Sequence, residues 1–487
     1  MGSRLSGGRY AVRMRILIVL VVFLTGCAAV EPARRPNIVF IMADDHAAHA
    51  VSCYGSKINT TPNLDRLAAQ GMRFTSALCT NAICTPARAT LLTGQYSHMN
   101  GVRDNSGVLP RETYHVAMAL GAHGYQTAMI GKWHLNRLPD GFDHWEVLPG
   151  QGEYHDPEFI TVNGKARVKG YVTDITIDKS IEWISSRDRS RPFMLFCHLK
   201  APHRSWDPDE KHAAAWRGRT IPLPATFDDD YATRSGAAWR QTMTVERHLT
   251  KRDVKFDAPA GLSGRDLKVW NYQRYMQDYL ACVESVDDNV GRLVEYLDAQ
   301  GLGEDTVVVY TSDQGFFLGD HGWYDKRFMY EPSLRSPLIV RYPREVAAGA
   351  VCDRMALGID YAPTFMDYAG VGRGEVPHEI QGESLRPLLR GERAEGWRES
   401  MYYHYYESGE PHTVAAHYGV RTERYKLIRF YGAVEAWELY DLKEDPEEIR
   451  NMYEDPGHAG VVRRMKEELS RLREYYKDTE PGIPGVK

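Results

Sequence analysis

Two segments of the chain have the composition of strands buried on both faces, and they constrain the fold more than any other feature. Residues 37–42 (NIVFIM) and 306–312 (TVVVYTS) are almost continuously apolar or β-branched. Runs of this kind are typical of parallel strands covered by helices on both sides. Similar runs at 127–131 and 193–198 alternate with helical patterns, of which residues 271–300 give the longest. The sequence therefore predicts an α/β fold with a doubly wound, mostly parallel sheet and helices on both faces.

The character of the sequence changes at about residue 377. Beyond it, short aromatic-rich segments alternate with turn residues, and residues 460–476 have the pattern of an amphipathic helix. We therefore expect a larger domain over residues 33–376 and a smaller C-terminal α+β subdomain with an antiparallel sheet over residues 377–487. Residues 204–267 interrupt the alternation of strands and helices with charged residues, prolines and tryptophans. We interpret them as a long ordered insertion near the edge of the sheet where ligands bind.

Residues 1–27 have the organisation of a signal peptide, which predicts export. Four arginines precede an apolar run at 16–24 that is too short to span a bilayer as an ordinary helix, so a permanent transmembrane anchor is the weaker interpretation. The segment ends in Leu24-Thr25-Gly26-Cys27, which resembles the cleavage box of bacterial lipoproteins, in which the cysteine is lipidated. This predicts a lipoprotein of the bacterial periplasm, outer membrane or cell surface, with simple cleavage of a secreted protein as the alternative. A membrane would be a partner only through this N-terminal lipid.

The charge balance excludes one class of partner. With 60 basic and 65 acidic side chains the formal net charge is −5, without the basic excess of a protein that binds nucleic acid. We therefore expect no nucleic-acid partner. A polyanionic substrate would have to be engaged through a locally basic pocket.

Acidic and amide side chains follow the two apolar runs described first. Asp44 and Asp45 come directly after residues 37–42, and Asp313 and Gln314 come directly after residues 306–312. Open α/β sheets bind ligands at the carboxyl ends of their strands, so we expect the four side chains to meet at one edge. Four oxygen ligands with three negative charges suit a hard divalent cation, calcium first and magnesium second. The alternative is that the aspartates are ordinary turn residues.

Lysine and histidine side chains follow two other predicted strands. One strand ends in Gly131-Lys132-Trp133-His134, and another leads into Ala201-Pro202-His203. A single histidine is more often structural or solvent-exposed than functional. Neighbouring strand ends that all carry Lys, His or Asp nevertheless favour a shared site at this edge of the sheet.

The pentapeptide Cys84-Thr85-Pro86-Ala87-Arg88 is the most unusual motif of the chain. One interpretation is structural: a small buried thiol, a proline in the first turn of a helix and a solvated or paired arginine. The other interpretation is a modification site, in which the cysteine is converted into a reactive group. The pentapeptide alone does not decide between them.

Together and in this order, the motifs resemble the signature of the type I, formylglycine-dependent sulfatases of the alkaline-phosphatase-like superfamily. The motifs that carry the resemblance are Asp44-Asp45, residues 84–88, residues 131–134, residues 201–203, residues 312–315 and Lys326. The resemblance extends from about residue 36 to Tyr453. It implies an alkaline-phosphatase-like fold, hydrolysis of sulfate esters, and oxidation of Cys84 to Cα-formylglycine. The oxidation needs a partner, either a formylglycine-generating enzyme or an anaerobic sulfatase-maturing enzyme.

The resemblance also implies a role for each site residue. The ligands of a divalent cation, usually calcium, would be Asp44, Asp45, Asp313, Gln314 and the formylglycine formed from Cys84. Many members have asparagine where this chain has glutamine, whose amide oxygen can serve in the same way. Arg88 would orient the hydrated formylglycine, which attacks sulfur as the nucleophile. Lys132 and Lys326 would offset charge on the sulfuryl oxygens. His203 would protonate the leaving sugar oxygen, and His134 would take a proton from the remaining hydroxyl group.

The substrate expected from the resemblance is a sulfated carbohydrate. Residues 141–152 and 170–174 look most like the N-acetylglucosamine-6-sulfatase branch, which implies 6-O-sulfated N-acetylglucosamine or a related hexosamine in glycosaminoglycan or mucin glycans. Asp320, His321 and Trp323 lie between the metal motif and the second lysine and could contact the sugar, or could form a glycine-bounded turn. Two alternative functions stay open: a phosphonate or phosphate ester hydrolase of the same superfamily, and a non-catalytic glycan-binding surface lipoprotein.

Overall fold

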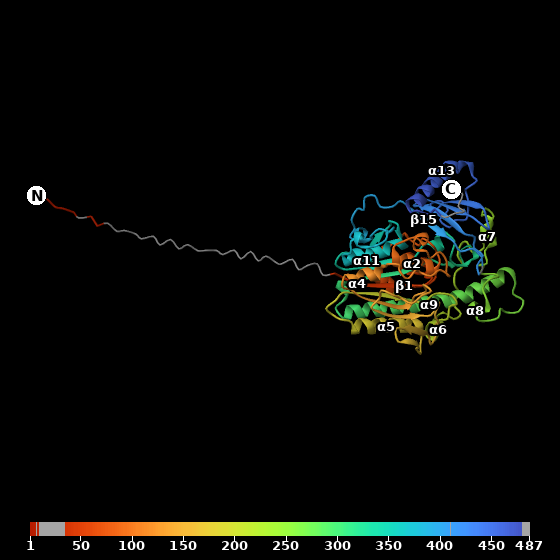
Figure 1. Ribbon diagram of the computed structural model, residues 1–487, viewed down its shortest axis with the longest axis horizontal. Coiled ribbons are helices and arrows are strands. Elements are labelled where there is room, and N and C mark those ends of the chain that lie inside the picture. The colour runs from red at the N-terminus through yellow and green to blue at the C-terminus, as the bar shows by residue number, and fades with distance from the viewer. Residues whose placement is uncertain (6, 9–34, 410, 480–487) are drawn as a thin grey trace. The chain divides into compact units, whose positions relative to one another are not determined.

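A ten-stranded sheet forms the centre of the computed structural model, which describes residues 1–5, 7–8, 35–409 and 411–479 (Figure 1). Five inner strands lie side by side and parallel. In spatial order they are β9 (Thr306–Ser312), β1 (Asn37–Ala43), β8 (Phe193–His198), β4 (Gln126–Lys132) and β5 (His144–Leu148). The strands predicted from the apolar runs therefore form the middle of the sheet.

The outer strands complete the sheet on both sides. Beyond β9 come β12 (Leu338–Arg341), which is antiparallel to it, then β2 (Met72–Phe74) and β13 (Ala350–Cys352). Beyond β5 come the antiparallel β6 (Glu158–Thr161) and β7 (Gly164–Arg167). The sheet is mostly parallel, as predicted.

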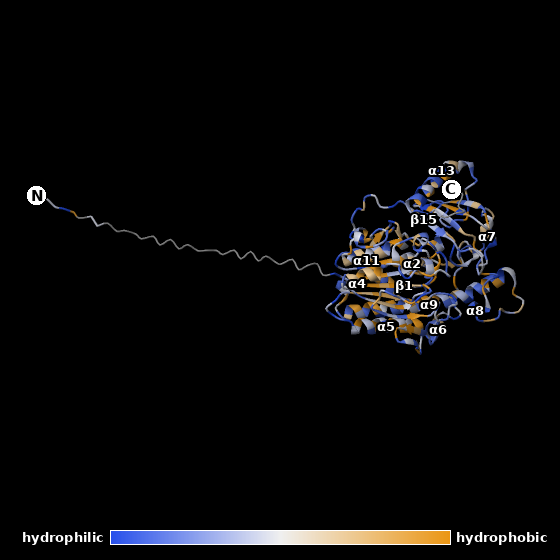
Figure 2. Ribbon diagram, viewed as in Figure 1, coloured by the Kyte–Doolittle hydropathy of each residue, from blue (hydrophilic) through white to orange (hydrophobic). Residues whose placement is uncertain are grey.

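Helices cover both faces of this sheet, and the side chains of β1 show why. Along β1, Ile38, Phe40 and Met42 belong to one hydrophobic core, and the residues between them belong to the other. The first core includes α2 (Cys84–Thr93), α4 (Val116–Ala122) and α11 (Tyr361–Ala369); the second includes α1 (Pro62–Ala69), α5 (Val172–Ser186) and α9 (Gly264–Ala299). In Figure 1, α2 and α11 of the first set and α5 and α9 of the second lie on opposite sides of β1, and Figure 2 shows the central strands in the orange of hydrophobic residues.

The insertion predicted at residues 204–267 contains only short helices before the chain enters α9. They are α6 (Glu210–Trp216), α7 (Gly236–Arg240) and α8 (Lys251–Val254). The long helix α9 begins seven residues before the predicted start at residue 271. None of residues 264–270 is buried and three of them are charged, so the first turns lack the apolar periodicity that reveals a buried helix.

Short elements connect these parts. They are α3 (Ser97–Asn100), α10 (Glu331–Leu334), α12 (Arg386–Leu389), the paired strands β3 (Ala77–Leu78) and β14 (Ala356–Leu357), and the hairpin of β10 (Phe317–Leu318) and β11 (Tyr324–Asp325). Seven 3₁₀ turns, from Ala48–Ala50 to Pro456–His458, join them among the described residues.

The C-terminal part contains the predicted antiparallel sheet. Its strands are β15 (Ser400–Tyr405), β16 (His417–Thr422), β17 (Tyr425–Phe430) and β18 (Ala436–Asp441), followed by α13 (Ala459–Tyr475). The described residues from Arg35 onward form one compact unit that contains both sheets, and the boundary at residue 377 stays a prediction.

Of the predicted signal peptide, residue 6 and residues 9–27, and with them Cys27, lie outside the described residues. Among the residues that are described, no helix is both long and apolar enough to cross a membrane.

Gly131, at the end of β4, shows how tightly the strands pack next to the predicted site. Its φ is +102°, and a Cβ atom there would lie 2.0 Å from the carbonyl oxygen of His198 on the neighbouring strand β8. Only glycine allows both the backbone conformation and the close approach of the two strands. The next residue is Lys132, so this glycine fixes where that lysine leaves the sheet.

We expect Gly131→Ala to lower the free energy of unfolding by roughly 3 kcal/mol or more, because backbone strain and the clash with β8 add. Gly55→Ala is a matched control, since Gly55 also has a positive φ (+88°) but nothing lies within 4 Å of its Cβ position. Gly55→Ala should lower the free energy of unfolding only by the cost of the backbone conformation, about 1–2 kcal/mol. Urea unfolding followed by circular dichroism measures both; equal losses would contradict the packing argument.

Candidate active site

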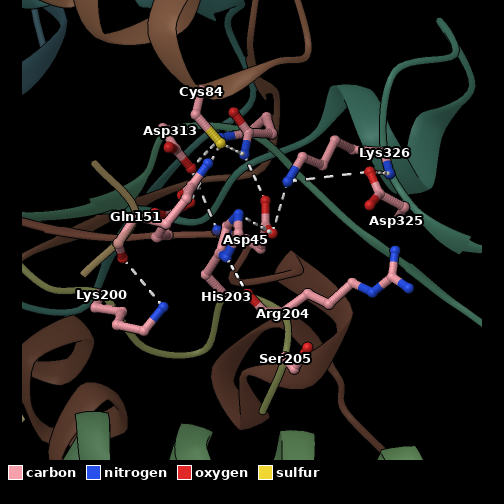
Figure 3. A network of polar contacts seen from close by, with 12 residues as sticks. Asp45, Cys84, Gln151, Lys200, His203, Arg204, Ser205, Asp313, Asp325 and Lys326 are labelled. Atoms are coloured by element: carbon pink, nitrogen blue, oxygen red, sulfur yellow. Dashed lines mark hydrogen bonds and ion pairs between the residues drawn. The ribbon is translucent and has the colours of Figure 1, made fainter. Parts of the chain in front are cut away.

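Two neighbouring parallel strands bring the four predicted metal ligands to one edge of the sheet. Asp44 and Asp45 follow β1, and Asp313 and Gln314 follow β9, its parallel neighbour. All four side chains are buried. One carboxylate oxygen from each of the three aspartates lies within 4.8 Å of the others. Figure 3 shows two of them, Asp45 and Asp313, beside Cys84.

The donor set fits a hard divalent cation. Gln314 Nε2 donates to Asp45 Oδ1 (2.6 Å), whereas Gln314 Oε1 is buried and has no hydrogen-bond partner among the described residues. A buried amide oxygen without a donor is costly unless something else binds it. Beside three clustered carboxylates, this oxygen is suited to a metal ion of the calcium or magnesium type.

Three cationic side chains surround the carboxylates. Arg88 Nη2 lies 3.1 Å from Asp313 Oδ2 and 3.3 Å from Asp44 Oδ2. Lys132 forms an ion pair with Asp44, and Lys326 Nζ donates to Asp45 Oδ2 (2.7 Å). These predicted residues come from α2, β4 and the segment after β11, and the fold brings them together.

Burial and charge give the three carboxylates different proton affinities. Burial opposes ionisation of Asp44, but Lys132 and other nearby cations hold its pKa well below the usual range. Burial raises the pKa of Asp45 to about 6, although the positive charge of Lys326 acts in the opposite direction. Burial and the negative charge of Asp44 raise the pKa of Asp313 to about 7. A bound divalent cation would favour the ionised form of all three.

Cys84 is the first residue of α2 and is fully buried beside this cluster. Its Sγ lies 3.5 Å from Asp44 Oδ1 and 3.7 Å from Gln314 Nε2. Burial and the negative charge of Asp44 raise the pKa of the thiol to about 12. The unmodified thiol is therefore protonated at neutral pH and is a poor nucleophile.

The two predicted histidines both lie beside the cluster. His134 Nδ1 is 3.3 Å from Oγ1 of Thr85, the residue after Cys84, and His203 Nε2 is 3.7 Å from Asp45 Oδ2. Burial and the charge of Lys132 lower the pKa of His134 to about 2 and hold that of His203 well below its ordinary value.

Strained backbone gathers around the same cluster. Asp45 (φ 65°), His134 (φ 53°), Asp325 (φ 76°) and Arg327 (φ 95°) all adopt the left-handed region. Each such residue costs about 1–3 kcal/mol, and residues of this kind concentrate at functional sites. These residues lie at or just after the ends of β1, β4 and β11, where the predicted site residues leave the strands.

Gln151 and Lys200 also belong to the site, although no role was predicted for them. The side-chain oxygen of Gln151 accepts a hydrogen bond from Lys132, and its main-chain oxygen accepts one from Lys200 Nζ (3.1 Å). Burial and the charge of Lys132 lower the pKa of Lys200 to about 7. The position of Lys200, three residues before His203, was the one sequence signal that could have identified it.

The residues predicted as sugar contacts pair with side chains outside the carboxylate cluster. His321 is almost fully buried, with Nδ1 2.8 Å from Asp229 Oδ2, and Trp323 is fully buried with its ring stacked on Tyr330. Asp320 Oδ2 lies 3.2 Å from Nε2 of His49, a histidine for which no role is predicted. The burial of His321 and Trp323 favours the glycine-bounded turn for these two residues, whereas Asp320 is partly exposed, and its contact with a sugar stays a prediction.

Comparison with known families is decisive for this cluster. Residues 36–371 match the family model described as Sulfatase, and residues 319–475 match one described as N-sulphoglucosamine sulphohydrolase, C-terminal. The chain belongs to the sulfatase family. It is therefore a sulfuric ester hydrolase, and its family implies a formylglycine and a metal ion, for which the three-aspartate cluster is the candidate site.

Individual sulfatases resemble this chain over most of its length. N-acetylglucosamine-6-O-sulfatase of Bacteroides thetaiotaomicron is 43% identical over 93% of this chain and 88% of its own length. N-acetylglucosamine-6-sulfatase of Homo sapiens is 28% identical over 80% of this chain and 72% of its own. A solved structure in complex with its substrate D-glucosamine-2-N,6-O-disulfate is 42% identical, covers 93% of this chain and 100% of its own, and has a TM-score of 0.90. The alkaline-phosphatase-like fold is thereby confirmed.

We expect calcium to raise the unfolding temperature of this sulfatase and a chelator to lower it, because the ion binds only the assembled carboxylates. At a free calcium concentration a hundred times the dissociation constant, the free energy of unfolding rises by about 2.7 kcal/mol. Asp45→Asn should lose most of this response. Asp287→Asn is the control: Asp287 is buried, with its pKa raised to about 6 by burial, but lies outside the cluster, so the response should stay. Differential scanning calorimetry checks this, and an unchanged response in Asp45→Asn would contradict the site.

Proposed function

We propose that this sulfatase removes the 6-O-sulfate of glucosamine units, N-acetylated or N-sulfated, in glycosaminoglycan or mucin glycans. The observation that carries the proposal is the similarity over almost the whole chain to an N-acetylglucosamine-6-O-sulfatase. It is supported by the similar structure whose substrate is a glucosamine 2-N,6-O-disulfate.

The nucleophile in this proposal comes from Cys84. The hydrated aldehyde of Cα-formylglycine supplies a hydroxyl group that can attack sulfur, which the protonated thiol cannot do. A maturing enzyme in the producing cell would have to make this conversion. Arg88 reaches the main-chain oxygen of Lys132 (2.6 Å) as well as two of the aspartates, so it holds α2 against the sheet at the position of the nucleophile.

The metal ion is proposed to be calcium, held by Asp44, Asp45, Asp313, Gln314 and the modified residue 84. The all-oxygen donor set supports this choice. An ion of this kind supplies positive charge for the sulfate oxygens. Arg88, Lys132 and Lys326 lie against the same three aspartates and add positive charge at this point.

The remaining residues would handle charge and protons around the ester. Lys132 and Lys326 already place their ammonium groups against the carboxylate cluster and would stabilise the sulfuryl oxygens as charge develops there. His203 would give a proton to the leaving sugar oxygen. His134, beside the residue that follows Cys84, would accept a proton from a hydroxyl group of the nucleophile.

We also propose that the protein is exported and carries an N-terminal lipid at Cys27. Support comes from the arginine-rich start, the apolar run at 16–24 and the Leu24–Cys27 box. Glycan degradation outside the cytoplasm is compatible with this location.

Peptide mass spectrometry of protein from a host with a maturing enzyme should find the aldehyde in place of the thiol at residue 84. Cys84→Ala should lower kcat on the order of 10³-fold or more, since the nucleophile is lost. Cys352→Ser, at the edge strand β13, is the matched control and should keep its activity. Substantial turnover by Cys84→Ala would refute the mechanism.

A screen of monosulfated sugars tests the substrate. We expect sulfate release from 6-O-sulfated N-acetylglucosamine with kcat/KM at least about tenfold above that for the 3-O- and 4-O-sulfated isomers, a difference of about 1.4 kcal/mol. Ion chromatography measures the released sulfate. An aryl phosphate in the same screen separates the sulfatase from a phosphate ester hydrolase. An active protein that leaves every 6-O-sulfated hexosamine intact would overturn the proposed substrate.

A further inference from the structure

The orientation of the His203 ring depends on a neighbouring main-chain carbonyl group. His203 Nδ1 is hydrogen-bonded to the main-chain oxygen of Arg204. A carbonyl oxygen only accepts, so Nδ1 carries a hydrogen and donates it. The other ring nitrogen, Nε2, is then the atom that faces Asp45 and the reaction centre and that can exchange a proton there.

The residue that supplies this carbonyl is itself held by a buried ion pair. Arg204 Nε donates to Asp253 Oδ1 (2.7 Å), and Arg204 Nη2 donates to Asp253 Oδ2 (2.6 Å). The Asp253 side chain is fully buried, and the guanidinium group lies over the ring of Tyr324, 4.8 Å from its centre. A bidentate pair fixes the arginine in orientation as well as in position.

Asp253 is in turn fixed by the short helix α8 of the insertion. Its Oδ2 accepts hydrogen bonds from the main-chain nitrogen (2.7 Å) and hydroxyl (2.8 Å) of Thr250, which precedes the helix. Its Oδ1 also accepts one from Ser205 Oγ (3.2 Å). The carboxylate therefore ties two segments together: the start of α8 and the consecutive residues Arg204 and Ser205.

A second contact holds His203 from the other side. The hydroxyl group of Tyr154 donates to the main-chain oxygen of His203 (2.7 Å). The two peptide groups that follow His203 in the chain, His203–Arg204 and Arg204–Ser205, thus both accept a hydrogen bond, and Figure 3 shows His203, Arg204 and Ser205 following one another along the edge of the cluster. Asp253 and Arg204 touch none of the reacting groups with their side chains.

We propose that the Arg204–Asp253 ion pair is a positioning device that holds the imidazole of His203 with Nε2 toward the leaving oxygen of the ester. The inference rests on the proposed role of His203 as general acid. It assigns a function to the insertion at residues 204–267: α8 supplies the carboxylate that orients the acid. Positioning of this kind acts on the chemical step, because a misplaced acid still allows the substrate to bind.

The test compares two esters with the mature enzyme. The leaving alkoxide of 6-O-sulfated N-acetylglucosamine needs a proton, whereas the leaving phenolate of 4-nitrophenyl sulfate does not. Asp253→Asn keeps the size of the side chain and removes its charge. We expect it to lower kcat on the sugar ester roughly 10- to 100-fold, with KM little changed, and to affect the aryl ester far less.

A matched control and a second variant separate positioning from folding. Glu345→Gln disrupts another bidentate pair, formed with Arg386 at 2.7 and 3.0 Å outside the site, and should leave the ratio of the two rates unchanged. Arg204→Lys keeps the positive charge but loses the planar fork, so we expect a smaller shift of the rate ratio in the same direction, even if Asp253→Asn fails to fold.

The deciding measurement uses the double variant His203→Ala/Asp253→Asn. If Asp253 acts through the imidazole, its substitution should cost nothing further on the sugar ester once the ring is gone. Equal losses on the two esters, or a full additional loss in the double variant, would overturn the positioning role. If His203→Ala alone lowers both rates equally, the acid assignment fails, and the positioning role fails with it for that separate reason.

Discussion

Three buried carboxylates within a few ångströms of one another are the constraint on which the rest of this structure depends. Burying a charge without a partner is costly, and like charges make it worse. Arg88, Lys132 and Lys326 offset this cost, because each forms an ion pair with at least one of the aspartates. Because these cations come from α2, β4 and the segment after β11, the electrostatic requirement fixes those elements around the ends of β1 and β9.

The same constraint explains the chemistry of residue 84. Helix α2 must begin beside the cluster for Arg88, one turn later, to reach two aspartates, and its first residue is then a thiol in contact with Asp44. In that environment burial and the charge of Asp44 raise the pKa of Cys84, which suppresses the thiolate. A nucleophile at this point needs a group other than a thiol, and the family's formylglycine provides one.

The sequence predicted most of what local pattern controls. The apolar runs located β1, β4, β8 and β9 within one residue at each end, and the rule that ligands gather at the carboxyl edge placed Asp44 and Asp313 together. Elements without a buried stripe were missed, such as β7, whose four residues are all exposed. Contacts between distant segments, for example Lys132 with Gln151, and the burial of Trp323 depend on tertiary packing that residue order does not reveal.

The path of the insertion connects substrate access with proton transfer. After β8 the chain passes His203 and enters the insertion. Before α9 begins, Asp253 of the insertion contacts Arg204, the residue next to His203. In our proposal, an insertion predicted to lie near the ligand-binding edge of the sheet is held by the same contact that orients the acid. A sugar alkoxide is a poor leaving group and needs a proton to depart. A change in the insertion that admits a different glycan would therefore also disturb the position of His203, the proposed proton donor. The proposal therefore couples substrate range and leaving-group demand through one buried carboxylate, that of Asp253.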